Sequence, residues 1–88
     1  MACVLIAYDL MKKKDYESLY KAIKSYGTWA HPQDSVWIVK TGNAAKEVRT
    51  HLKKHIDSDD KLLCVGLNGA WGTSGHSTNV NDWLKNNL

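Results

Sequence analysis

Apolar residues form two kinds of pattern along this chain, and the first, a continuous run, is typical of buried β-strands. Residues 3–8 form a nearly continuous apolar run, which predicts a central strand covered on at least one face. Residues 35–41 and 62–67 have similar chemistry and predict a strong third strand and a buried last strand. Residues 29–31 predict a short second strand that Pro32 stops.

The second pattern, apolar residues three and four positions apart, is typical of amphipathic helices. Over residues 16–26 apolar side chains recur three and four positions apart, after Asp15 as an N-cap and before Gly27. A second helix is predicted to open at residues 42–43, and residues 79–87 predict a short terminal helix. The three lysines at 12–14 predict a basic turn.

The order of these elements favours one fold. Strand, helix, strand, strand, helix and strand in succession are the split βαβ pattern of ferredoxin-like α+β domains. We therefore expect a single domain over residues 1–88, with an antiparallel sheet in the order 4-1-3-2 and an added C-terminal helix. This topology places Asp9 beside residues 34–35 and 59–60, and the glycine-rich loop 69–75 near residues 41–43.

Length and charge narrow the classes of function. A chain of 88 residues builds one modest core, so a large cavity inside one copy is not expected, and small domains of this kind often dimerise. The net charge of +3 permits nucleotide or nucleic-acid phosphates as partners. Cys3 and Cys64 lie in apolar runs and are expected to be buried thiols of a reducing cytoplasm. No apolar run is long enough to cross a membrane.

Several short motifs resemble known families. Tyr8-Asp9-Leu10 after the first strand and the later Ser35-Val36-Trp37 resemble the small ferredoxin-like nuclease-fold subunit of CRISPR adaptation. The fuller set is similar to a related group, the SinR-like bacterial and phage proteins. Its matching positions are Trp29, His31-Pro32, Asp34-Ser35, Trp37, Asp60-Lys61-Leu62-Leu63, Trp71-Gly72 and Trp83-Leu84-Lys85.

The CRISPR resemblance implies a homodimer with an aspartate at the position of Asp9 that faces the dimer axis. In some members that aspartate supports metal-dependent phosphodiester cleavage, and in others the fold only bridges DNA. This chain departs from the family in two places. Residues 27–31 lack the arginine that is usual before the Ser-Val step, and a glycine loop and helix replace the terminal strand. Both departures argue against integration activity.

Asp9 is the first candidate site residue. A carboxylate at the end of a strand can hold a hard divalent cation such as Mg²⁺, which could activate water for phosphodiester attack. One carboxylate is a poor metal site, so the pair in a dimer or help from Asp34, Asp59 or Asp60 would be needed. The alternatives are a cap for the following turn and a dimer contact.

The loop at residues 69–75 is the second candidate. Backbone N–H groups in glycine-rich turns bind anions, Gly72, Thr73 and Ser74 could supply donors, and Trp71 could stack on a base. The alternative is a plain connection to the last helix. Lys46 and Arg49, with Lys53 and the nearby Asn43, could follow a phosphate backbone, or could be an ordinary solvated helix face.

Three functions remain open at this point. The first is a homodimer that binds nucleic acid or a nucleotide, with metal-dependent nuclease activity through Asp9 as an extension. The second is a phage-type sponge that sequesters a cyclic nucleotide messenger in the loop at Trp71 without catalysis. The third is a structural dimeric module. The four tryptophans at 29, 37, 71 and 83 are expected mostly in the core or dimer contact, and the alternative is that one or two of them line a base-stacking pocket. His31 could pair with Asp34 as a general base.

Overall fold

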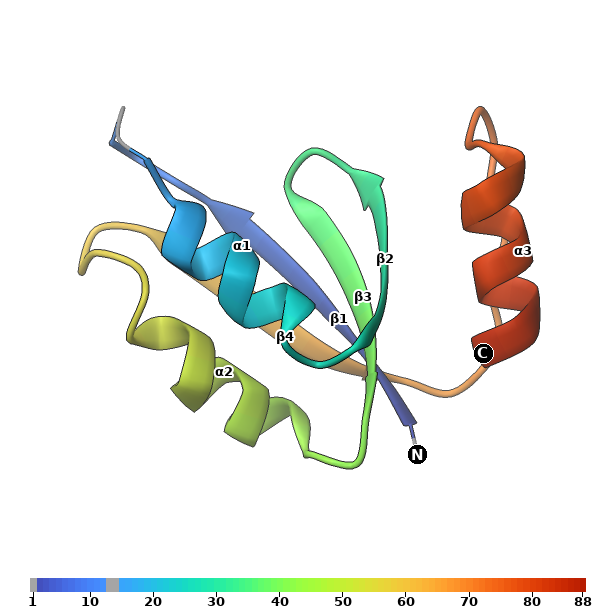
Figure 1. The fold of residues 1–88 in the computed structure, drawn as a ribbon, viewed down its shortest axis with the longest axis horizontal. Coiled ribbons are helices and arrows are strands. Elements are labelled where there is room, and N and C mark those ends of the chain that lie inside the picture. The colour runs from blue at the N-terminus through green and yellow to red at the C-terminus, as the bar shows by residue number, and fades with distance from the viewer. Residues whose placement is uncertain (1, 13–14) are drawn as a thin grey trace.

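The computed structural model describes residues 2–12 and 15–88, so Lys13 and Lys14 of the predicted basic turn lie outside the described residues. One antiparallel sheet has the strand order β2-β3-β1-β4, which is the predicted order. The α+β ferredoxin-like prediction is therefore confirmed, including the added helix (Figure 1). In chain order the elements are β1 (Ala2–Asp9), α1 (Glu17–Lys24), β2 (Thr28–Gln33), β3 (Val36–Thr41), α2 (Ala45–Lys53), β4 (Lys61–Leu67) and α3 (Thr78–Asn87).

Helices α1 and α2 cover one face of the sheet, where the main core lies (Figure 1). Alternate residues of a strand point to opposite faces, so every second side chain of β1 and β3 turns toward these helices. Leu19 and Ile23 of α1 and Val48 and Leu52 of α2 are fully buried against them. The strand side of this core consists of Val4, Ile6, Tyr8, Trp37 and Val39.

Helix α3 packs on the other face of the sheet and forms a second, smaller core. Its Leu84 is buried with Cys3 and Ile38, and Val80 and Trp83 pack around them. The helix begins at Ser77, whose side chain accepts a hydrogen bond from the Val80 N–H, a common N-terminal cap. This face is only partly covered, because α3 contacts β2 and the nearby ends of the central strands.

Two details of the strands differ from the prediction. The last strand is buried on one face only: β4 lies at a sheet edge, and its Leu62 and Cys64 pack against the main core. On its other face Leu63 and Val65 are 57% and 42% exposed because no described element covers them. Pro32 does not stop the second strand but lies inside β2, within a register shift between Ala30 and Gln33. It is tolerated there because β2 is the other edge strand, where a missing N–H leaves no ladder bond unmade.

The helix ends are close to those predicted. The Asp15 carboxylate accepts from the Glu17 N–H at 2.9 Å, although Tyr16 rather than Asp15 holds the cap position of α1. Gly27 follows the end of α1 with a φ of +92°, a conformation that glycine adopts without strain. The Glu47 carboxylate accepts from the Ala44 N–H and ties down the start of α2.

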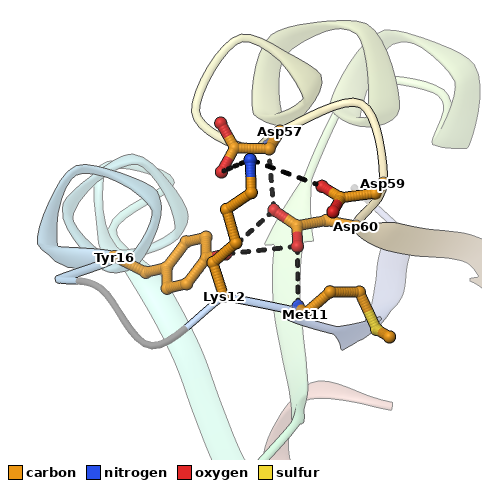
Figure 2. A network of polar contacts seen from close by, with 6 residues as sticks. All are labelled: Met11, Lys12, Tyr16, Asp57, Asp59 and Asp60. Atoms are coloured by element: carbon orange, nitrogen blue, oxygen red, sulfur yellow. Dashed lines mark hydrogen bonds and ion pairs between the residues drawn. The ribbon is translucent and has the colours of Figure 1, made fainter.

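A single carboxylate holds the two connections at the Asp9 end of the sheet together. Asp60 accepts from the Met11 N–H at 2.8 Å, from the Tyr16 hydroxyl at 3.1 Å and from the Asp57 N–H at 2.8 Å (Figure 2). These donors come from the end of β1, the start of α1 and the turn after α2. The exposed Lys12 ammonium adds ion pairs to Asp57 at 3.6 Å and Asp59 at 3.9 Å.

Replacement of Asp60 should therefore destabilise the fold at these connections. Asp60→Ala removes the acceptor for three donors, and we expect a loss of about 2–4 kcal/mol in the free energy of unfolding, measured by urea denaturation. Asp59→Ala is the matched control, because its exposed ion pair contributes less than about 1 kcal/mol. Equal losses in the two variants would contradict a special role for Asp60.

Candidate functional site

The register of the sheet assembles the surroundings of Asp9 as predicted. Asp9 ends β1 directly opposite Lys61, the first residue of β4. On its other side the Tyr8 N–H donates to the Ser35 carbonyl at 3.1 Å, so the β2–β3 turn lies next to the end of β1. The Asp9 side chain is exposed on the face of the sheet away from α1 and α2, since Tyr8 next to it belongs to the core.

Two of the three carboxylates expected to help Asp9 are engaged elsewhere. Asp60 is committed to the network of Figure 2, and Asp59 faces Lys12. Across residues 2–12 and 15–88, no group of three histidine, cysteine or acidic side chains could hold a metal ion. Within the described part of one copy, Asp9 therefore belongs to no group of three metal-ligating side chains.

Beside Asp9 the uncovered part of the sheet is apolar. Ala7, Leu63 and Val65 come from the paired strands β1 and β4, with Ala7 directly opposite Leu63. A shallow pocket of about 260 Å³ runs along this corner between Asp9 and Leu63. Exposed apolar side chains gathered on one sheet face mark a contact surface, and this one has a carboxylate at its border.

The basic residues of α2 form the predicted stripe. Val48 and Leu52 bury one side of the helix, which leaves Lys46, Arg49 and Lys53 exposed on the other. Arg49 and Lys53 also border a groove of about 460 Å³ that continues to Ser58 and Leu62. Asn43 lies in the turn before α2, where its N–H donates to the Thr41 hydroxyl.

The glycine-rich loop does not join this basic stripe. It leaves the sheet at the end where Thr41 lies, as predicted, but then runs along α3, far from α2 in the view of Figure 1. The Thr73 hydroxyl donates to the side-chain oxygen of Asn81 in α3 at 2.6 Å, and the Ser74 carbonyl contacts His76. Trp71 is 43% exposed. The ligand residues predicted from sequence thus fall into two separate groups.

An aromatic cluster lies between α1 and the β2–β3 hairpin, and it contains Trp37 and His31 of the segment for which the sequence left a base-stacking pocket as an alternative. Trp37 is buried and donates from Nε1 to the Tyr8 hydroxyl at 2.9 Å, and that hydroxyl contacts the Asp34 carbonyl at 3.2 Å. The His31 ring stacks on Trp37 with 3.7 Å between centroids. His31 contacts the Asp34 backbone carbonyl rather than its carboxylate, so the expected acid–base pair is not formed.

The fold and these positions agree with a comparison to known families. The profile of the family described as CRISPR associated protein Cas2 matches residues 1–73. The chain belongs to the Cas2 family. The match contains the whole ferredoxin-like sheet, both helices of the main core and Asp9. Among the described residues no helix is long and apolar enough to span a membrane.

The part of this Cas2-family chain beyond the match is structurally distinct. Helix α3 lies outside residues 1–73, and it covers part of the sheet face on which Asp9 is displayed. The sequence predicted that a loop and helix follow the last strand, and the structure confirms it. Any contact of a second molecule with this face must therefore use the uncovered corner at Ala7, Leu63 and Val65.

The hydrogen bond of Tyr8 gives a prediction that depends on pH. Burial is the main cause that raises the pKa of the Tyr8 phenol above its ordinary value of 10.0. As pH rises above that value the unfolded chain loses its proton first, so the free energy of unfolding of the wild type should fall. Below it the contribution of Tyr8 is constant. Tyr8→Phe lacks this decline, and at neutral pH it costs about 1–3 kcal/mol because Trp37 loses a buried acceptor.

Urea denaturation of both proteins at neutral pH and at about pH 11 measures the two effects. The difference in stability between wild type and Tyr8→Phe should be largest at neutral pH and should shrink at alkaline pH. The same difference at both values would show that ionisation of Tyr8 is not linked to folding.

Proposed function

We propose that this Cas2-family protein is a homodimer that binds a phosphodiester ligand, with a nucleic-acid duplex as the first candidate. The observation that carries the proposal is the exposed stripe of Lys46, Arg49 and Lys53 on one side of α2. Cations along one helix side attract a phosphate backbone whatever its sequence. The groove beside Arg49 and Lys53 is also lined by Asp57 and Asp60, so the proposed path of the backbone follows the exposed side of the helix rather than the groove.

The second copy is proposed to bind at the uncovered corner of the sheet. Leu63 and Val65 are large apolar side chains exposed there, and the resemblance to the CRISPR subunit implies a dimer in which the position of Asp9 faces the axis. Asp9 lies at this corner, beside Ala7 and Leu63. A second copy on this corner would leave the stripe on α2 free, because α2 covers the opposite face of the sheet.

Binding without cleavage is the favoured activity. Asp60 and Asp59 are held by other partners, and one copy provides no cluster of metal-ligating side chains within the described residues. A nuclease would need the Asp9 residues of two copies, with magnesium between them. We place that reaction behind simple binding for this reason.

A second candidate function is capture of a cyclic nucleotide without catalysis, as in the phage-type sponge. This function would go together with a closer relation to the SinR-like group. The exposed ring of Trp71 favours it, since it could stack on a base. It ranks second because the Thr73 hydroxyl already donates to Asn81 and the loop from 69 to 75 carries no charge to meet the phosphates.

The dimer is tested at Leu63. Leu63→Glu places a charge in the proposed contact and should convert a two-chain particle to single chains, measured by light scattering after size exclusion. Trp71→Ala, which removes an exposed apolar side chain of the loop between β4 and α3 that does not line the corner, should leave the mass unchanged. A wild type of one-chain mass, or a Leu63→Glu variant that stays dimeric, would contradict the proposed contact.

Duplex binding is tested at Arg49. Arg49→Glu should weaken binding of a fluorescent duplex about tenfold or more and lower the slope of log Kd against log salt by about 1. Lys85→Glu, an equal charge reversal on the exposed side of α3, is the control and should change affinity far less. An affinity that ignores salt, or equal losses in both variants, would overturn the role of the stripe.

The same samples decide between binding and cleavage. With magnesium present the duplex should remain intact on a denaturing gel. Cleavage that disappears in Asp9→Ala while the fold survives would replace the binding proposal with the nuclease reaction.

A further inference from the structure

A second cavity lies apart from the basic stripe, between α1 and the β2–β3 hairpin. Its volume is about 370 Å³, which is within the range of small-ligand pockets. Four elements, β1, α1, β2 and β3, and the hairpin turn contribute to it. Its lining residues are Tyr8, Glu17, Tyr20, Lys24, His31, Asp34 and Trp37.

The walls of this cavity are mainly aromatic. The Tyr20 and Trp37 rings lie close to parallel, 24° apart with centroids separated by 6.3 Å, and Tyr8 lies 6.3 Å from Tyr20. The exposed His31 ring is stacked on Trp37 within 10° of parallel. Trp37 and Tyr8 are themselves buried, so the rings open to a ligand are those of His31 and Tyr20. A planar heteroaromatic ring could stack on them with little reordering of the protein, because their neighbours hold them in place.

The charged side chains at the cavity are the acidic Glu17 and Asp34 and the basic Lys24. Glu17, Tyr20 and Lys24 lie three and four positions apart along α1, so all three face the cavity from one side of the helix. The Lys24 ammonium lies 5.4 Å from the Trp29 ring and 5.9 Å from the Trp37 ring, which holds it at the aromatic wall. The carboxylates of Glu17 and Asp34 can accept hydrogen bonds from donor groups of a ligand, and Lys24 is the group that would meet its anionic part.

We propose that this cavity binds a nucleotide unit whose base carries an exocyclic amino group. The base would stack on the aromatic wall and donate from its amino group to Glu17 or Asp34, and its phosphate would meet Lys24. A uracil base has no exocyclic amino group and offers these carboxylates only its ring N3–H, so it should bind more weakly.

The site differs from the proposed duplex surface and stays accessible in the proposed dimer. It is built on α1 and the hairpin, whereas the stripe lies on α2 and the dimer contact on the opposite face of the sheet. The same nucleotide chemistry has two sources, a free mononucleotide or an unpaired nucleotide at the end of a strand.

Calorimetric titration of the full chain with AMP, GMP, CMP and UMP tests the site. At least one of the first three should bind about fivefold or more tightly than UMP. Lys24→Gln should weaken that nucleotide about fivefold or more, and Asp34→Asn should reduce its preference over UMP. Lys21→Gln is the matched control, because Lys21 is exposed on the same helix but does not line the cavity, and its effect should stay within about twofold.

Absence of binding by all four nucleotides at millimolar concentration overturns the proposal, as does an equal effect of Lys24→Gln and Lys21→Gln. Binding of tetramethylammonium in place of nucleotides also overturns it in favour of a cation site. Arg49→Glu separates this site from the duplex surface, since it should leave mononucleotide affinity unchanged. A labelled strand with an unpaired terminal nucleotide, titrated into wild type and Lys24→Gln, then identifies which source of the nucleotide the cavity takes.

Discussion

The Asp60 carboxylate is the interaction on which the Asp9 end of the molecule depends. It accepts hydrogen bonds from Met11, Tyr16 and Asp57, and so it joins the exit of β1, the entrance of α1 and the turn between α2 and β4. Because the Asp60 carboxylate binds both connections, it fixes the position over the sheet at which α1 begins. The position of α1 in turn brings Tyr20 and Lys24 to the hairpin that carries His31 and Trp37. A structural carboxylate thus determines the shape of a cavity that it does not line.

Much of the fold could be predicted from the sequence because local patterns and connectivity agree. Nearly continuous apolar runs located the strands, helical spacing located α1 and α2, and the element order implied the sheet order that the structure has. The neighbours of Asp9 followed from that sheet order alone. Because strands pair in a regular register, the sheet order is enough to predict which residues lie beside one another on paired strands.

The candidate sites were less predictable, and the reason is the same for each. An apolar run shows that a strand packs on something, but not which element covers its second face, so β4 was predicted to be buried although Leu63 is exposed. The course of the loop at Trp71 depends on where α3 docks, which its own residues do not reveal. The donors to Asp60 lie as far as 49 positions away, and the aromatic cavity likewise joins segments distant in sequence. Both required coordinates.

Pro32 has a consequence that extends beyond the shape of the hairpin. A sheet edge normally offers a row of N–H and C=O groups to which a strand of another molecule can add, and so exposes a protein to fibril growth. Of the two edges of this sheet, β2 has a proline without an N–H and a break in register next to it. That edge is therefore a poor template for strand addition. Strand β4 pairs in a regular register, so a strand of another molecule could add at its free edge. Growth could therefore start at β4 but could not readily continue from the β2 edge.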